Sequence, residues 1–90
     1  MVKITLKEQE QTGTYKFSGQ IYYTRGIEAE FGNMTFKLIA ETLHLIKELV
    51  NINTADYFQV AIAEMEDGRK IKVYIIDDVT HITFLLPTEY

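Results

Sequence analysis

Hydrophobic and polar residues alternate at the start of the chain, over residues 2–7 and again over residues 14–24. A period of two is typical of strands buried on one face, because successive side chains of a strand point to opposite sides. The polar stretch between the two runs predicts a hairpin loop, so we expect these strands to pair. The residues of the second run predicted to point inward are Tyr15, Phe17, Ile21 and Tyr23.

The period becomes that of a helix after Asn33, which is the expected N-cap. Spacings of three and four predict one amphipathic helix of about 18 residues. Its core-facing stripe is Phe36, Ile39, Leu43, Ile46 and Val50. A second apolar row, made of Leu38, Leu45 and Leu49, lies beside that stripe and is available to loops or to a second copy of the protein.

Three alternating runs fill the last third of the chain, and Asp67-Gly68 separates the first two. An Asp-Gly pair in this setting favours a two-residue hairpin turn. The opposed pairs would then be Glu64 with Ile71, Ile62 with Val73, and Val60 with Ile75. A second tight connection at residues 77–80 would oppose Ile75 to Ile82 and Val73 to Phe84. These runs predict a meander with Val60 and Ile62 on the buried face.

Together the elements predict an α+β fold in the order β-β-α-β-β-β, with a single helix packed on one face of an antiparallel sheet of about five strands. No linker or repeat interrupts the 90 residues, so residues 1–90 are expected to form one domain. The chain has no cysteine, which excludes disulfides and thiolate metal sites. No apolar run is long enough for a signal peptide or a membrane span. We therefore expect a cytoplasmic location.

The sheet face away from the helix is expected to carry lysines and tyrosines and no acid, although the net charge is −4. Its predicted residues are Lys3, Thr5, Lys7, Lys16, Ser18, Gln20, Tyr22, Tyr57, Gln59, Ala61, Ala63, Met65, Lys70, Lys72, Tyr74, Ile76, His81, Thr83 and Leu85. An ordinary solvated sheet face has a similar composition. The face is thus either plain solvent surface or a working surface.

Small and aromatic residues side by side favour a flat protein contact on this face. The sequence thus predicts a small non-enzymatic protein–protein interaction module that binds a partner protein or forms a homodimer, through the sheet face or the Leu38, Leu45 and Leu49 row. The partner-binding candidates are Tyr22, Arg25, Tyr57, Gln59, Lys72, Tyr74, Ile76 and Leu85. The alternative is binding of single-stranded nucleic acid by the lysines and tyrosines, which the net negative charge disfavours.

Catalysis is the weakest interpretation. Neither His44 nor His81 has a serine, cysteine or paired carboxylate at an informative spacing. Asp77 and Asp78 fit turn formers better than metal ligands, because a hard cation needs several converging oxygens. The glycines form neither a P-loop nor a dinucleotide fingerprint, so no cofactor is expected.

A sequence pattern in the middle of the chain resembles a known family. Tyr-x-Thr-Arg-Gly-Ile begins at residue 22, and Asp-Tyr-x-Gln-Val follows the predicted helix at residue 56. Over roughly residues 22–62 the chain resembles a family of small uncharacterised proteins from staphylococci, other Gram-positive bacteria and their mobile elements. The resemblance implies a bacterial or phage protein, and a shared structural or binding role for Tyr23, Arg25, Gly26, Tyr57 and Gln59. It does not extend to the first hairpin or the last strand.

Overall fold

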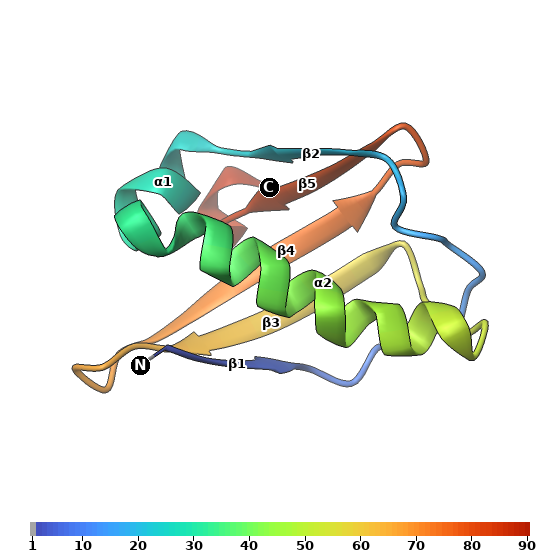
Figure 1. Cartoon of the computed structure of the whole chain (residues 1–90), viewed down its shortest axis with the longest axis horizontal. Helices are drawn as coiled ribbons and strands as arrows, with labels where there is room; N and C mark the ends of the chain where they lie inside the picture. Colours follow the sequence, from blue (N-terminus) through green and yellow to red (C-terminus); the bar gives the residue numbers. More distant parts are fainter. Residues whose placement is uncertain (1) are drawn as a thin grey trace.

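The computed structural model describes residues 2–90 as two layers, a five-stranded sheet with helices across one face (Figure 1). The α+β class and a mostly antiparallel sheet are confirmed. The elements in chain order are β1 (Lys3–Leu6), β2 (Gln20–Tyr23), α1 (Arg25–Phe31), η1 (Gly32–Met34), α2 (Thr35–Asn51), β3 (Phe58–Glu64), β4 (Lys70–Asp77), β5 (His81–Leu85) and η2 (Pro87–Glu89).

The strand order is β1-β3-β4-β5-β2, so the two strands nearest the start of the chain lie at opposite edges of the sheet. The predicted hairpin between them is therefore wrong, and β2 instead runs parallel to β5. Only residues 20–23 of the second alternating run are strand. Of its predicted inward residues Phe17 is buried, whereas Tyr15, Ile21 and Tyr23 are exposed.

The segment before β2, residues 15–17, does not pair with a single strand. Its hydrogen-bond partners come from different elements, and it crosses the end of the sheet. The N–H of Tyr15 donates to the carbonyl of Ala55, and the N–H of Phe17 donates to Oδ2 of the buried Asp77 at 2.9 Å. From the helix layer, Nζ of Lys47 donates to the carbonyls of Lys16 and Phe17, each at 3.2 Å. These long-range bonds replace the strand ladder that the alternation predicted.

The β3–β4 hairpin has a different register from the predicted one. Its loop is one residue longer than expected: the N–H of Met65 donates to the carbonyl of Arg69 at 2.8 Å, and Gly68 has a φ of +91°. Ala61 therefore lies opposite Val73, and Glu64 lies opposite Lys70.

A register shift of one residue moves every side chain of a strand to the other face. Gln59, Ala61 and Ala63 are accordingly buried on the helix side, while Val60 and Ile62, predicted to be buried there, are half-buried on the opposite face. Three-residue loops with a glycine at positive φ are a common hairpin type. The small alanines also leave room for the helix to approach the sheet.

The faces predicted for the last two strands are confirmed, because their register is shifted by an even number of residues. Ile75 lies opposite Phe84 rather than Ile82, and Asp77 lies opposite Ile82. All of these side chains, like Val73, are buried on the helix side. The reversal between the strands is tight, and Val79 adopts a φ of +82° in it.

The predicted helix is present as α2, and Ile39 and Ile46 of the predicted stripe are buried, but the buried side is rotated away from Phe36 and toward Leu38. Leu38, Ile39, Thr42 and Ile46 face the sheet, whereas Phe36 is 72% exposed. The expected N-cap is also wrong, since Asn33 lies in η1, and Met34 precedes α2 without a side-chain cap. Both differences arise because the short helix α1 precedes α2 in the chain. Ile27 and Phe31 of α1 fill part of the core.

Candidate interaction surfaces

The outer face, meaning the sheet face away from α2, is not covered by a helix layer; of the elements described in residues 2–90, only η2 lies behind it in Figure 1. The register and the alternation of side chains define its members. They are Lys3, Thr5, Lys7, Gln20, Tyr22, Phe58, Val60, Ile62, Glu64, Lys70, Lys72, Tyr74, Ile76, His81, Thr83 and Leu85. Glu64 contradicts the expectation that this face has no acid.

The outer face is graded from charged to aromatic along the strands. At the end near the β3–β4 hairpin, one row across the sheet holds Lys3, Glu64 and Lys70. At the opposite end, a row across β3, β4, β5 and β2 holds Phe58, Ile76, Thr83 and Tyr22. The face therefore offers an apolar end and a charged end.

Two of the predicted partner-binding residues do not belong to an open surface. Gln59 is 1% exposed and faces the helix layer, where its Nε2 donates to Oε1 of Gln9 at 2.7 Å and to the carbonyl of Asp56 at 3.1 Å. Its role is to hold the residue 9 loop. Leu85 lies on the outer face but is only 8% exposed. The predicted contact residues Ala61 and Ala63 are buried as well.

An aromatic cluster of Tyr57, Phe58, Tyr74 and Tyr90 occupies the apolar end. The ring centroids of Phe58 and Tyr74 are 4.9 Å apart, and Tyr90 meets these two rings at 5.6 and 5.7 Å. Tyr57 joins through Phe58 at 6.1 Å. The sequence missed Phe58 because its strand was assigned the wrong register, and it missed Tyr90 because no periodicity reaches the last residue.

Glu89 holds the C-terminal turn that carries Tyr90. Its Oε1 accepts hydrogen bonds from Oγ1 of Thr24 at 2.5 Å and from the N–H of Leu86 at 2.9 Å, and its Oε2 accepts one from the N–H of Gly26 at 3.1 Å. The bond from Thr24 is the main reason that the pKa of Glu89 lies below its ordinary value, and the two N–H donors add to it.

Gly26 is the residue of α1 that lies closest to the carboxylate of Glu89. It lies inside α1, and a Cβ at this position would be 2.7 Å from the carboxylate of Glu89. The glycine therefore lets the C-terminal turn approach α1. Arg25 begins the same helix, beyond the end of β2, and so lies off the outer face.

Tyr22 and the β4 residues remain the accessible members of the predicted site. Tyr22 is 50% exposed, and its ring stacks on His81 with centroids 4.7 Å apart. Lys72 is exposed, and Tyr74 and Ile76 are half-buried on the same face. The structure thus brings Tyr22, Lys72, Tyr74 and Ile76 to the outer face, whereas Tyr57 precedes β3 and joins this face only through its ring contact with Phe58.

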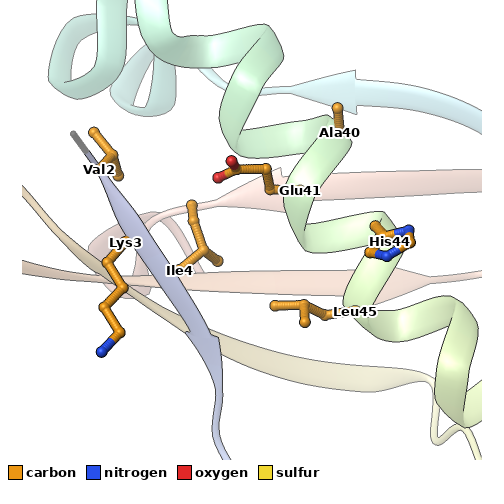
Figure 2. A pocket seen from close by; sticks show the side chains of 7 residues that line it. All are labelled: Val2, Lys3, Ile4, Ala40, Glu41, His44 and Leu45. Carbon is orange, nitrogen blue, oxygen red and sulfur yellow. The ribbon is translucent and has the colours of Figure 1, made fainter.

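A groove of about 640 Å³ runs between β1 and α2 on the helix side of the sheet edge. Figure 2 shows the side chain of Ile4 directed toward α2, between Glu41 and Leu45. Val2, Ala40 and His44 complete the lining with the backbone of Lys3 nearby. Of the predicted second apolar row, Leu45 lines this groove, whereas Leu38 is buried in the core.

Within residues 2–90 there is no cluster of three or more His, Asp or Glu side chains suited to a metal ion. No helix in the same range is both long and apolar enough to cross a membrane. No family model matches the chain, and no curated protein or solved structure matches it either. The family resemblance stays a prediction, and the function is inferred from these surfaces.

Proposed function

We propose that this protein is a non-enzymatic protein-binding module that contacts a partner protein with the aromatic end of its outer face. The observation that carries the proposal is the row of apolar and aromatic side chains on a sheet face that lacks a helix layer. The uncovered face of a two-layer sheet is usually polar, but here the register of β3 brings Phe58, Val60 and Ile62 onto it. Apolar side chains that stay half-buried on an uncovered face, as these do, are typical of contact surfaces.

The ring geometry favours a protein over a nucleic acid. Tyr90 meets Tyr74 at an interplanar angle of 89° and Phe58 at 84°, so the rings pack edge to face on one another. Bases need free ring faces on which to stack. The chain's net charge of −4 and Glu64 among the lysines also oppose a polyanion.

Within this proposal the partner is a host protein of a bacterium, and the module comes from a phage or mobile element. The support for this setting is the resemblance over residues 22–62. The small size of the chain agrees with a module that acts by binding.

Single-stranded nucleic acid is the second candidate, and one observation favours it. Lys3, Lys7, Lys70 and Lys72 share the outer face with the exposed Tyr22. Fluorescence anisotropy with labelled oligonucleotides at low and high salt tests it. Binding at low salt that weakens steeply as salt is raised would favour the nucleic acid, and no binding at low salt would reject it.

Affinity capture from a Gram-positive lysate tests the proposed contact. Tyr74→Glu places a charge at the centre of the aromatic cluster, and Phe36→Glu is the matched control because Phe36 is an exposed aromatic residue in the helix layer. We expect the native protein and the control to recover the same partner and Tyr74→Glu to lose it. Circular dichroism melting checks that both variants are folded. Equal recovery by Tyr74→Glu would remove the outer face as the contact surface.

A further inference from the structure

The edge strand β1 has one side open for pairing. The N–H of Lys7 donates to the carbonyl of Val60 at 2.8 Å, in line with the pairing of Lys3 with Glu64 and Thr5 with Ile62. In an antiparallel pair such bonded residues alternate. The N–H and C=O groups of Val2, Ile4 and Leu6 therefore point away from β3, where no described strand lies.

The sequence of β1 is complementary to itself in one register. An antiparallel pair of β1 strands centred on Ile4 sets Ile4 against its own copy and Val2 against Leu6, so every outward N–H meets an outward C=O. The apolar side chains all stay on the helix side. On the outer face the same register sets Lys3 against Thr5, which places no like charges opposite each other.

The neighbouring registers are disfavoured by charge. Centring the pair on Thr5 sets Lys3 directly against Lys7 of the other strand, and centring it on Lys3 sets that lysine against its own copy. Like charges directly opposite one another destabilise a strand pair by roughly 0.2 to 1 kcal/mol for each contact. Two such contacts arise when the axis lies at Thr5. The lysines of β1 thus select the register at Ile4.

The groove beside β1 supplies apolar surface for the same contact. Its floor consists of Val2, Ile4, Ala40 and Leu45, and it is open on the side of the strand edge (Figure 2). In the Ile4 register, Leu6 of the second copy enters next to Val2. A second hollow of about 620 Å³, lined in part by Leu6, Leu45 and Leu49, continues along the same side of α2. Pairing of the strands therefore also buries side chains.

From these observations we propose that two copies of this protein associate through β1, antiparallel and centred on Ile4, to form one continuous ten-stranded sheet with both α2 helices on the same side. This contact lies at the sheet edge and leaves the aromatic end of the outer face open. A closed two-fold contact uses the same patch on both copies and cannot extend into a filament.

The test is sedimentation velocity of the full chain over a range of concentrations, with a matched pair of variants at the exposed Thr5. Thr5→Lys places two lysines opposite each other on each side of the axis, and we expect the dimer dissociation constant to rise about tenfold. Thr5→Glu pairs a carboxylate with Lys3 instead, and we expect the constant to fall or stay the same. Thermal melting at low protein concentration measures the effect of each variant on the fold itself.

The outcomes separate the proposal from its alternatives. A dimer that Thr5→Lys weakens and Thr5→Glu does not weaken supports it, and restored dimerisation in the double variant Lys3→Glu/Thr5→Lys adds to that support. Equal weakening by both variants would place the axis at Thr5 and overturn the register. A native chain that stays monomeric, grows beyond a dimer, or dimerises regardless of residue 5 would overturn the proposal. Capture of a partner protein by Tyr74→Glu tests the outer face and does not depend on whether the protein is a monomer or a dimer.

Discussion

The two edges of the sheet differ in how strongly their sequences specify a partner strand. At β1, lysines alternate with apolar residues, so charge on one face and burial on the other select a single register. At β2, Gln20–Tyr23 carries no charge, and all four residues are exposed. Exposed uncharged edges are where proteins associate without a fixed register. In the proposed dimer, the lysines that protect the β1 edge from random pairing are also the ones that select its register.

The edges also differ in what lies beside them on the helix side. Beside β1 there is a groove with an apolar floor. Beside β2 there is a small apolar patch, in which the ring of Tyr23 meets the exposed Phe36 edge to face at 6.1 Å. Side chains of a partner can enter the groove beside β1. The patch beside β2 is only exposed apolar surface next to a strand whose pairing register is not defined.

Phe84→Ala is expected to have the largest effect, and it acts beneath the β2 edge. Phe84 is fully buried and lies opposite Tyr23, so its removal leaves a cavity where β2 is attached. We expect a loss of about 3 to 5 kcal/mol in the free energy of unfolding. Urea denaturation measures it. A loss below about 1 kcal/mol would contradict the burial of Phe84 between β5 and the helix layer beside β2.

Ala63→Leu tests the support of the β1 edge in the same way. Ala63 is fully buried and lies opposite Ile4, so a larger side chain overpacks the space between β3 and α2. We expect a loss of about 1 to 3 kcal/mol. The matched control is Ile62→Leu, which conserves volume on the outer face and should change stability by less than about 1.5 kcal/mol. A larger loss for Ile62→Leu than for Ala63→Leu would contradict this register and support the two-residue turn at Gly68 that the sequence predicted.

Glu89 links the end of β2 to the C-terminal turn, and acid is expected to loosen this link. Because the folded pKa of Glu89 lies below its ordinary 4.5, its contribution to stability is fully present above pH 4.5 and is lost as the pH falls through the folded value. Melting temperatures of the native protein and Glu89→Gln should therefore differ at neutral pH and converge in acid. A difference that stays constant with pH would show that the charge of Glu89 is not involved.

Ile21→Lys should have the smallest effect on stability, because Ile21 is exposed on the β2 edge. We expect a change within about 0.5 kcal/mol, together with slower aggregation, since a lysine on an edge strand hinders pairing with other chains. Light scattering on heating measures the aggregation. The same variant should leave the proposed β1 dimer intact, and loss of that dimer would show that both edges take part in one contact.

Much of the fold follows from local periodicity. The span of α2 and the buried faces of β4 and β5 were predicted because spacings of three, four and two are properties of the chain itself. The β4–β5 faces were right although the opposed pairs were not, since an even shift keeps the same side chains inward. Tyr22, Lys72, Tyr74 and Ile76 were correctly placed on the outer face, where the last two are half-buried.

The errors on β3 have one cause, which is dependence on a single residue of loop length. The prediction for β3 assumed a two-residue turn, and one additional residue in the loop exchanged Val60 and Ile62 for Gln59, Ala61 and Ala63 on the buried side. Both loops agree with an Asp-Gly pair. The prediction of Gln59 as a contact residue failed with this register.

The sequence by itself determined the type of most elements and the apolar side of β4 and β5, because these depend on neighbours along the chain. Only the tertiary structure decided that β1 and β2 lie at opposite edges and which face of β3 is buried. The physical reason is that these choices depend on groups far apart in sequence, such as the carboxylate of Asp77 that accepts the N–H of Phe17. Such contacts stabilise the fold only after distant parts of the chain have come together, so the local pattern of residues does not reveal them.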